Sequence, residues 1–458
     1  MSGPHSKSLI KTFLHGEAVF AFWNFSTKGV GLLNTFLTIS SLTLYQYGVF
    51  QLLLSIAGLS FDVTSLGGGV ISNEITRAVG EKREADAKKI YLEYFFARIS
   101  LAILLWAIVF FGSTYIFSSY SLEFIKDMRV ISFLFLTEVI FLTIRTLCLV
   151  RLKLSLIGIR AALNKSIQFV ILLFFFVQGN LGLKQLIWSI VISSFLSLLV
   201  ILPNFFRIFG EWKGVKATPT KLLFNIFLTN GTWEVSRQLI NKATFRIKPW
   251  LIKLFISTEA VAIFSIAEMI VSTLQDVLPS KTLQSIVPLW LKEKKLSAKM
   301  FSFGIKYYFL TGLALAIIAL IIVPPVINLF FDKYTQSLSL FYFMILNLPI
   351  FAVGIVTGNY VVAHRKQKFL FFLHLSRNIL ALLIILCTLP FIGLWGLAIE
   401  SVIVPFLMTL GIYFYTKKRT PGFHFDQKII FGFSGEDRDI VKKLFTEIKG
   451  IFLKIKAI

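Results

Sequence analysis

The chain has 458 residues, of which 56% are hydrophobic and 15% are charged, and its mean hydropathy is +0.79. Its 47 Lys and Arg residues outnumber 23 Asp and Glu residues, which gives a formal net charge of +24. A soluble domain has an apolar share of about 45–50%, and a soluble chain this apolar would have nowhere to place its hydrophobic surface. The composition excludes an ordinary cytosolic enzyme, a disordered protein and a secreted disulfide scaffold. It indicates an all-α protein that crosses a membrane many times.

Apolar stretches long enough to cross a membrane recur along the whole chain. A spanning helix needs about 20 mostly apolar residues. The start of the chain is polar, so we expect no cleavable secretory signal there. We predict about twelve spans, with two of them longer than a bilayer requires. They cover residues 17–40, 47–74, 91–117, 129–150, 155–178, 183–206, 222–247, 257–290, 303–328, 336–362, 369–390 and 395–416.

The basic residues between these spans predict the orientation of the chain. With the N-terminus in the cytoplasm, the inner segments hold 34 Lys and Arg residues and the outer loops hold six. This is the asymmetry of the positive-inside rule, so we expect both termini in the cytoplasm. Because the positive charge is already explained by topology, we expect no nucleic acid partner.

An internal repeat divides the chain into two halves. The segment YGVFQLLLSI at 47–56 resembles VAIFSIAEMI at 261–270, and LGLKQLIWSIVISSFL at 181–196 resembles IGLWGLAIESVIVPFL at 392–407. The offsets of 214 and 211 residues predict two six-helix lobes of the same orientation, related by a pseudo-two-fold axis along the membrane normal. We therefore expect an N-terminal lobe at 1–206, a cytoplasmic linker at 207–221, a C-terminal lobe at 222–416 and a tail at 417–458.

Polar residues at helical spacing form stripes on four of the predicted spans, the first, second, seventh and eighth. The repeat offset carries these stripes onto one another, so that Asp62 aligns with Asp276 and Asn24 with Arg237. The cations of the stripes are Lys28, Arg237, Lys242 and Arg246. The uncharged polar members include Asn24, Gln51, Asn230 and Asn241, and the acids are Glu17, Asp62, Glu234 and Asp276.

The cost of charge in a membrane indicates where these stripes point. One charged residue at the centre of a spanning helix costs about 2.5–3.5 kcal/mol, and the seventh span carries several. Such a helix must face water or polar partners rather than lipid. Two readings stay open: the stripes line a cavity, or they form structural ion pairs that seal the bundle. Glu138 and Arg145, seven residues apart in the fourth span, allow the same two readings.

The tail and the cysteines add little chemistry. After Pro421, apolar residues and lysines alternate at helical spacing, which predicts a basic amphipathic helix on the membrane surface, either as a lipid anchor or as a docking site for a partner.

Cys148 and Cys387 lie in apolar runs, and the five histidines have no ligand spacing, so we expect neither a disulfide nor a metal site.

The chain resembles the polysaccharide and O-antigen flippases of the multidrug/oligosaccharidyl-lipid/polysaccharide exporter superfamily. The resemblance rests on the order of several loose patterns between residues 17 and 416: LYQYGVFQLLLSI, RAVGEKREADAKKI, PWLIKLFISTEAVAIFSIAEMI, VPLWLKEKK and IGLWGLAIESVI. It implies a two-lobed bundle with a cavity lined by the first, second, seventh and eighth spans. It also implies an undecaprenyl diphosphate-linked oligosaccharide as cargo and the bacterial inner membrane as location.

The stripes suggest how such a cargo would be handled. We expect alternating access, with the four cations meeting the diphosphate and the uncharged polar residues meeting sugar hydroxyls. The acids, Asp62 or Asp276 first, would balance charge or bind a proton or Na⁺ for coupling. No glycine-rich ATP-binding loop is present, and we expect no other cofactor. Membrane lipids, and the polymerase and glycosyltransferases of the same pathway, are further candidate partners.

Two other functions fit parts of the pattern. A multidrug or cation antiporter of the same superfamily would also have twelve spans and acids within the membrane, but the cavity cations disfavour cationic drugs. A polysaccharide polymerase or glycosyltransferase of the membrane would need an acid and base pair on a large outer loop, and the sequence offers no outer loop of that size. We therefore expect a transporter rather than an enzyme.

Overall fold

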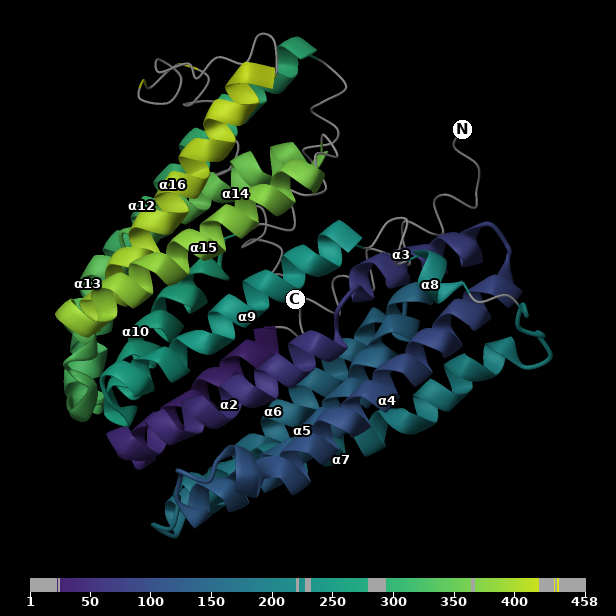
Figure 1. Cartoon of the computed structure of the whole chain (residues 1–458), viewed down its shortest axis with the longest axis horizontal. Helices are drawn as coiled ribbons and strands as arrows, with labels where there is room; N and C mark the ends of the chain where they lie inside the picture. Colours follow the sequence, from purple (N-terminus) through teal and green to yellow (C-terminus); the bar gives the residue numbers. More distant parts are fainter. Residues whose placement is uncertain are drawn as a thin grey trace, which may run out of the picture. The chain divides into compact units, whose positions relative to one another are not determined.

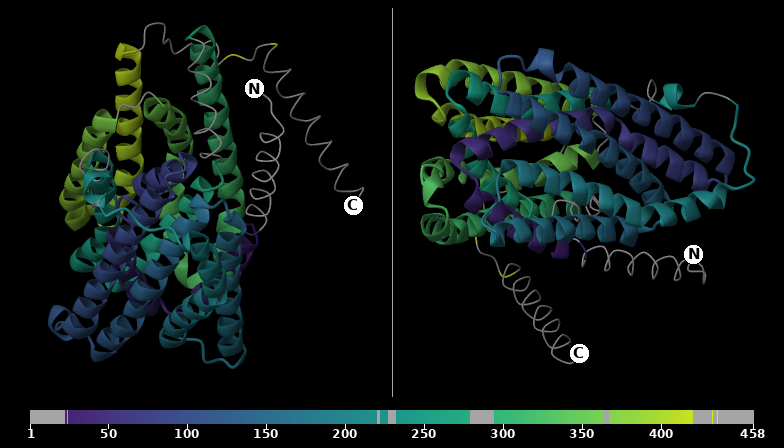
Figure 2. Two further views of the ribbon diagram at one scale, coloured as in Figure 1. Left: turned by 90° about the vertical axis from the view of Figure 1, so that its right-hand side faces the viewer. Right: turned by 90° about the horizontal axis from the view of Figure 1, so that it is seen from below.

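The computed structural model describes residues 23, 25–219, 222–226, 232–278, 294–363, 367–419, 432 and 435, and within them it contains helices and no strand (Figures 1 and 2). Residues 25–41 are helical and precede the labelled elements. The long helices are α2 (Leu44–Thr64), α3 (Gly68–Gly80), α4 (Glu84–Ile116), α5 (Leu122–Val150), α6 (Leu154–Val177), α7 (Leu183–Phe209), α9 (Thr232–Phe255), α10 (Thr258–Gln275), α12 (Lys294–Phe330), α14 (Asn347–Ala363), α15 (Gln367–Ile392) and α16 (Trp395–Arg419). Shorter elements are η1 (Gly210–Trp212), α8 (Leu223–Ile226), η3 (Asp332–Tyr334) and α13 (Ser337–Met344). The predicted all-α polytopic fold is confirmed.

Helices of membrane-spanning length account for most of the predicted spans. Within the described ranges, nine helices are long and apolar enough to cross a membrane, and α13 with α14, bent by 41°, make a tenth. The other two predicted spans correspond to the helix at 25–41, whose start is not described, and to α9. Helix α9 carries six charged residues, so it cannot lie in lipid without polar neighbours.

The predicted second span is broken into two helices. Helix α2 begins with a capping box, in which Thr43 and Gln46 satisfy each other's backbone N–H groups, and it ends at Thr64. Gly67 then adopts a left-handed conformation with φ of +69° before α3 begins. Three consecutive glycines, each costing about 1 kcal/mol in a helix, explain why the chain bends here. The break places Asp62 and Ser65 at the end of α2.

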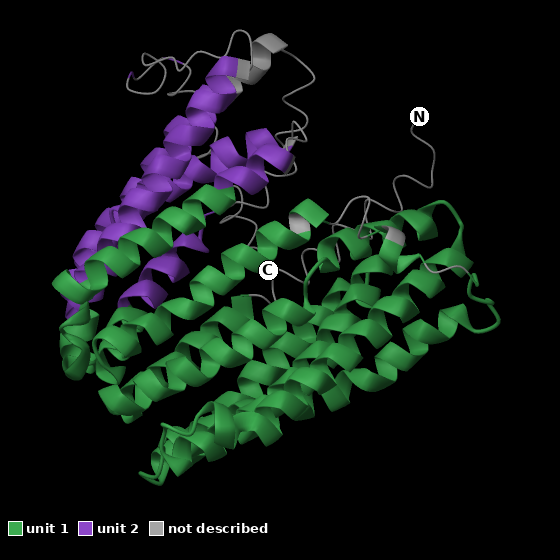
Figure 3. Ribbon diagram, viewed as in Figure 1, with its two compact units in different colours: residues 1–266, 326–337, 374–394 green, residues 267–325, 338–373, 395–458 purple. Residues whose placement is uncertain are grey.

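The chain forms two compact units (Figure 3). Unit 1 comprises residues 1–266, 326–337 and 374–394, and unit 2 comprises 267–325, 338–373 and 395–458. The predicted lobe boundaries at 206 and 222 follow the internal repeat and stay a prediction.

Each unit has its own packed interior. In unit 1, a cluster of buried apolar residues joins α3, α4, α5 and α7, with the fully buried Trp212 at one end. In unit 2, α14 packs along α16. A Cβ on Gly312 would come within 2.9 Å of the Pro349 backbone, so α12 and α14 approach closely there.

Polar contacts anchor both ends of the unit 1 bundle. At the end predicted to face the cytoplasm, Arg151 pairs with Glu84 at 3.0 Å and with Glu211 at 3.3 Å. At the opposite end, the Lys333 ammonium donates to the carbonyl oxygen of Ser40 at 2.8 Å. Burial there lowers the pKa of Lys333 from its ordinary value. The predicted amphipathic helix of the tail lies outside the described residues.

Candidate functional site

Helices α2 and α9 pack side by side within unit 1, and small residues allow their close approach (Figure 1). A Cβ on Gly48 would lie 2.0 Å from the carbonyl oxygen of Thr258, at the start of α10. A Cβ on Gly58 would lie 2.1 Å from the guanidinium carbon of Arg246. Trp250 donates from its indole nitrogen to the Ser55 hydroxyl at 2.6 Å. The polar stripe predicted on the second span is therefore the face that α2 turns toward the charged helix.

Three charges meet on this face, and we call them the Asp62 cluster: Asp62 of α2 with Lys242 and Arg246 of α9. One carboxylate oxygen lies 3.2 Å from the Lys242 ammonium, and the other lies 2.9 Å from Nε of Arg246. Lys242 also donates to the Ser65 hydroxyl at 3.0 Å. The side chains are 18% exposed for Asp62, 32% for Lys242 and 29% for Arg246. The cluster is thus half-buried, and its members carry a net charge of +1.

The predicted cations and acids of this cluster are in contact with one another. Of the two readings of the stripes, ion pairing describes these three residues in the present structure. Pairing and substrate recognition are compatible, however, because one carboxylate cannot neutralise two cations. The remaining positive charge stays within reach of an anion that enters beside α2 and α9.

A second polar group joins α9 to α15 in unit 1. The amide oxygen of Asn241 accepts from Arg377 at 2.9 Å and from Asn378 at 2.5 Å. Nδ2 of Asn241 lies 3.5 Å from Nδ1 of His374, and Arg237 interacts electrostatically with the same ring. The sequence predicted Arg237 and Asn241 as site residues. It missed their partners, although 374, 377 and 378 share one helical face and that spacing was a usable signal.

A third polar group lies inside the N-terminal helices of unit 1, and we call it the Glu138 network. Glu138 of α5 binds Arg160 of α6 through both carboxylate oxygens, with one contact at 3.1 Å. Ser194 of α7 donates to Glu138 at 2.5 Å and accepts from Arg160 at 3.0 Å. The Arg160 guanidinium also lies 4.0 Å from the centre of the Phe141 ring. Glu138 therefore pairs with Arg160, which the sequence analysis had not considered as its partner.

The other predicted site residues are more scattered. Lys28 is exposed on the helix at 25–41, and Gln51 lies one helical turn from Tyr47 and hydrogen-bonds to it. Asp276 lies just past the end of α10 and is exposed. Glu17, Asn24, Asn230 and the side chain of Glu234 lie outside what the structure describes. No group of three or more His, Cys, Asp or Glu residues that could hold a metal occurs in the described part of the chain.

Known structures share this arrangement of helices. The chain resembles an inward-facing multidrug resistance MATE family transporter of the MOP superfamily, with a TM-score of 0.70 and 14% identity over 86% of this chain and 94% of that one. It resembles a MOP superfamily transporter from Pyrococcus furiosus, whose binding pocket is described as having reverse polarity, with a TM-score of 0.58 and 14% identity over 90% and 94% of the two chains. A mutant MATE transporter from Vibrio cholerae matches with a TM-score of 0.59 and 13% identity over 90% and 97%.

Sequence comparison identifies the family. No curated protein matches the chain significantly in sequence. Residues 13–294, more than half of the chain, match the profile of the family described as polysaccharide biosynthesis protein. The chain therefore belongs to the polysaccharide biosynthesis protein family, and it has the polytopic membrane fold of the MOP superfamily transporters that it resembles.

Proposed function

We propose that the protein is a flippase that moves a lipid-linked oligosaccharide, carried on undecaprenyl diphosphate, from the cytoplasmic to the outer leaflet of a bacterial inner membrane. Family membership supports the link to polysaccharide synthesis. The observation that carries the choice of substrate is the Asp62 cluster, in which two cations share one carboxylate. A diphosphate suits this cluster better than a neutral lipid or an organic cation, because it adds the negative charge that the cluster lacks.

Substrate binding would proceed by exchange of anions. With no substrate, Asp62 holds Lys242 and Arg246 and limits the cost of two cations among apolar helices. An entering diphosphate offers more acceptor oxygens than one carboxylate, so it displaces Asp62 from one or both cations. Arg246 presents a planar set of donors that suits a phosphate, while Lys242 acts as a compact charge that can follow it.

This exchange also gives Asp62 a role in coupling. Once displaced, the carboxylate is free of its positive partners, and a proton or a Na⁺ ion that binds it would keep it from recapturing Lys242 and Arg246. Release of that ion would restore the ion pairs and expel the diphosphate. The two predicted lobes, one with α2 and the other with α9, would alternate between these states.

One observation favours the second candidate function, a multidrug or cation antiporter. The Asp62 carboxylate lies between two cations that an organic cation could replace, and the matched MATE structures include a multidrug resistance transporter. Under this candidate, removal of Asp62 would abolish transport, whereas removal of Arg246 would leave the acid in place.

Complementation separates the two candidates. In cells that lack their own flippase gene, we expect Arg246→Ala to reach normal abundance and to lose at least about 90% of surface polysaccharide, because a loss of 1.4 kcal/mol corresponds to tenfold. The matched control is Lys213→Ala, which removes an exposed cation outside the spanning helices. Normal export by Arg246→Ala would refute diphosphate recognition by the cluster. Drug resistance that depends on Asp62, without export, would establish the antiporter.

A further inference from the structure

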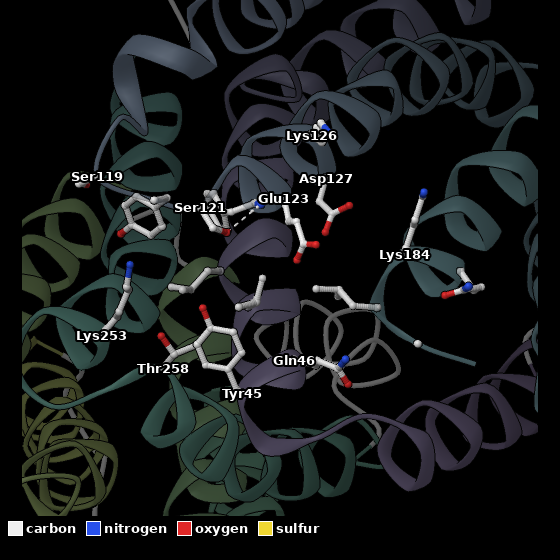
Figure 4. A pocket seen from close by; sticks show the side chains of 17 residues that line it. Tyr45, Gln46, Ser119, Ser121, Glu123, Lys126, Asp127, Lys184, Lys253 and Thr258 are labelled. Atoms are coloured by element: carbon white, nitrogen blue, oxygen red, sulfur yellow. Dashed lines mark hydrogen bonds between the residues drawn. The ribbon is translucent and has the colours of Figure 1, made fainter. Parts of the chain in front are cut away.

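A cavity lies at the opposite end of unit 1 from the helix break near Asp62. It has a volume of about 600 Å³, which falls in the range of about 300–1,000 Å³ that small-molecule sites occupy. Its walls are the start of α2, the turn between α4 and α5, the starts of α5, α7 and α10, and the end of α9 (Figure 4). These are the helix ends that the positive-inside count assigns to the outer side of the membrane.

Charge is concentrated in this cavity. Of the six Lys and Arg residues in the predicted outer loops, three line it, namely Lys126, Lys184 and Lys253. Two carboxylates, Glu123 and Asp127, occupy one face of α5, four residues apart. Half of the basic residues expected on the outer side of the membrane therefore line this one cavity, together with two acidic residues.

These charges line the cavity without closing on one another. Among the described residues, no ion pair joins Glu123 or Asp127 to any of the three lysines, although Asp127 interacts electrostatically with Glu123 and Lys184. In Figure 4, the Glu123 carboxylate points into the cavity, with Lys184 on one side and Lys253 and Tyr45 on the other. The cavity therefore offers strong donors and strong acceptors to whatever enters it.

Aromatic rings and amides complete the lining. Tyr45 is 54% exposed at the start of α2, and the Lys253 ammonium lies 3.1 Å from the centre of the Tyr120 ring. Tyr120 also stacks on Phe124, so its ring holds Lys253 in place rather than facing a ligand. Gln185 adds a side-chain amide that both donates and accepts hydrogen bonds, and Gln46 adds amide donors. The Tyr45 ring can cover an apolar face of a small ligand while the polar groups bind its edges.

The lining limits the class of ligand. An anion would meet Glu123 and Asp127, an organic cation would meet three lysines, and an apolar molecule would leave all five charges without water. A neutral molecule rich in hydroxyl groups satisfies both signs, because each hydroxyl donates one hydrogen bond and accepts others. We infer that this cavity binds a sugar residue of the glycan after it has crossed the membrane. The inference rests on the proposed flippase function and extends it with a receiving site on the outer side.

Cysteine protection tests this site. Cys148 is buried and Cys387 is exposed, so the background is Cys387→Ser. The reporter is Gln185→Cys in the first turn of α7, which lines the cavity, and the control is Asn180→Cys, which is exposed in the connection just before α7 but does not line the cavity. Purified protein in vesicles of phosphatidylcholine and phosphatidylglycerol is labelled with a membrane-impermeant maleimide. The probe is the oligosaccharide released by mild acid from the lipid-linked repeat units of the complemented strain.

We expect the oligosaccharide to slow labelling of Gln185→Cys roughly threefold at about twice its Kd, since the fraction of empty sites falls as the inverse of one plus the ratio of ligand to Kd. Labelling of Asn180→Cys should not change. Protection should disappear when Glu123→Gln and Asp127→Asn are added, while abundance and thermal unfolding in detergent report that the protein is folded. If glycerophosphoethanolamine protects and the oligosaccharide does not, the cavity binds a zwitterionic lipid headgroup and the inference is wrong.

Export by the same strains separates the two proposals. If the wild-type chain restores export and the oligosaccharide gives no protection, the receiving site is refuted and the flippase stands. If the oligosaccharide protects but the wild-type chain does not restore export, the cavity binds sugar but receives no flipped glycan, and both proposals are refuted as stated. If neither protection nor export is found, both proposals fall.

Discussion

The Asp62 cluster and the Glu138 network contain the same kinds of residue and differ in how they are enclosed. In the Glu138 network, the Arg160 side chain is 6% exposed, and Lys165 interacts electrostatically with the same carboxylate. In the Asp62 cluster, one carboxylate, buried to about the same degree as that of Glu138, faces two cations that are each about one-third exposed. The Arg160 guanidinium suits a structural role, since it is buried against Glu138, Ser194 and the Phe141 ring and is out of reach of a ligand. The half-open group keeps one positive charge and is placed to exchange its anion.

The largest expected effect comes from breaking the sealed pair. Glu138→Ala leaves Arg160 buried without its carboxylate, and we expect the free energy of unfolding to fall by about 3–5 kcal/mol. Asp62→Ala should cost less than Glu138→Ala, because Lys242 and Arg246 are each about one-third exposed and Lys242 keeps its hydrogen bond to Ser65. Thermal unfolding of the purified variants in detergent measures both. If Asp62→Ala destabilises the protein as strongly as Glu138→Ala, the contrast between the two groups is wrong.

The sequence predicted much of the fold because its signals are local. Helical periodicity and apolar length place the spans, and the polar stripes identify the facing sides of α2 and α9 correctly. The partner of Glu138 could not be found this way, because Arg145 is its neighbour along α5 whereas Arg160 approaches from another helix. The break at Gly67 was visible as three glycines but was overlooked within a long apolar run.

Residue types alone also could not show whether the charged residues of the stripes pair with one another or bind a substrate. Lys242, Arg246 and Asp62 carry the same sequence pattern whether they bind one another or a substrate. Only the distances between helices show that two cations share one acid. The cavity around Glu123 and Lys184 was missed for a related reason, since its lining comes from five helices and one turn that are far apart in sequence.

Glycine substitutions test the packing that holds the Asp62 cluster together. A Cβ on Gly48 would meet the backbone carbonyl of Thr258, which cannot turn away, so we expect Gly48→Ala to cost about 1–3 kcal/mol. A Cβ on Gly58 would meet the end of the Arg246 side chain, which can move. We therefore expect Gly58→Ala to lower the free energy of unfolding less than Gly48→Ala does, and to reduce the transport rate more. Gly69→Ala is the control, because nothing lies within 4 Å of its Cβ position. Equal stability losses for Gly48→Ala and Gly58→Ala would contradict this account of the α2 face.

Neutralising Asp62 tests anion exchange directly. In the wild type, a short-chain prenyl sulfate must displace the Asp62 carboxylate before it can bind Lys242 and Arg246. Asp62→Asn removes that competing charge, so we expect binding about tenfold tighter, which corresponds to about 1.4 kcal/mol. An affinity no higher in Asp62→Asn than in the wild type would argue against anion exchange at this cluster.

The smallest expected effect lies outside the membrane, where charge pairs are fully hydrated. Hydrogen bonds from Arg83 and then Arg77 hold the pKa of the Glu81 carboxyl below its ordinary value. Because the folded-state pKa is the lower one, the pairing stabilises the protein above the ordinary Glu pKa of about 4.3. That stability is lost as the pH falls through the folded-state value. Glu81→Gln should therefore lower Tm slightly at neutral pH and not at all in acid. A Tm difference that is independent of pH would mean that Glu81 acts through its shape rather than its charge. The Glu81 pairs would then differ in kind from the Asp62 cluster and the Glu138 network, where charge pairing holds the side chains together.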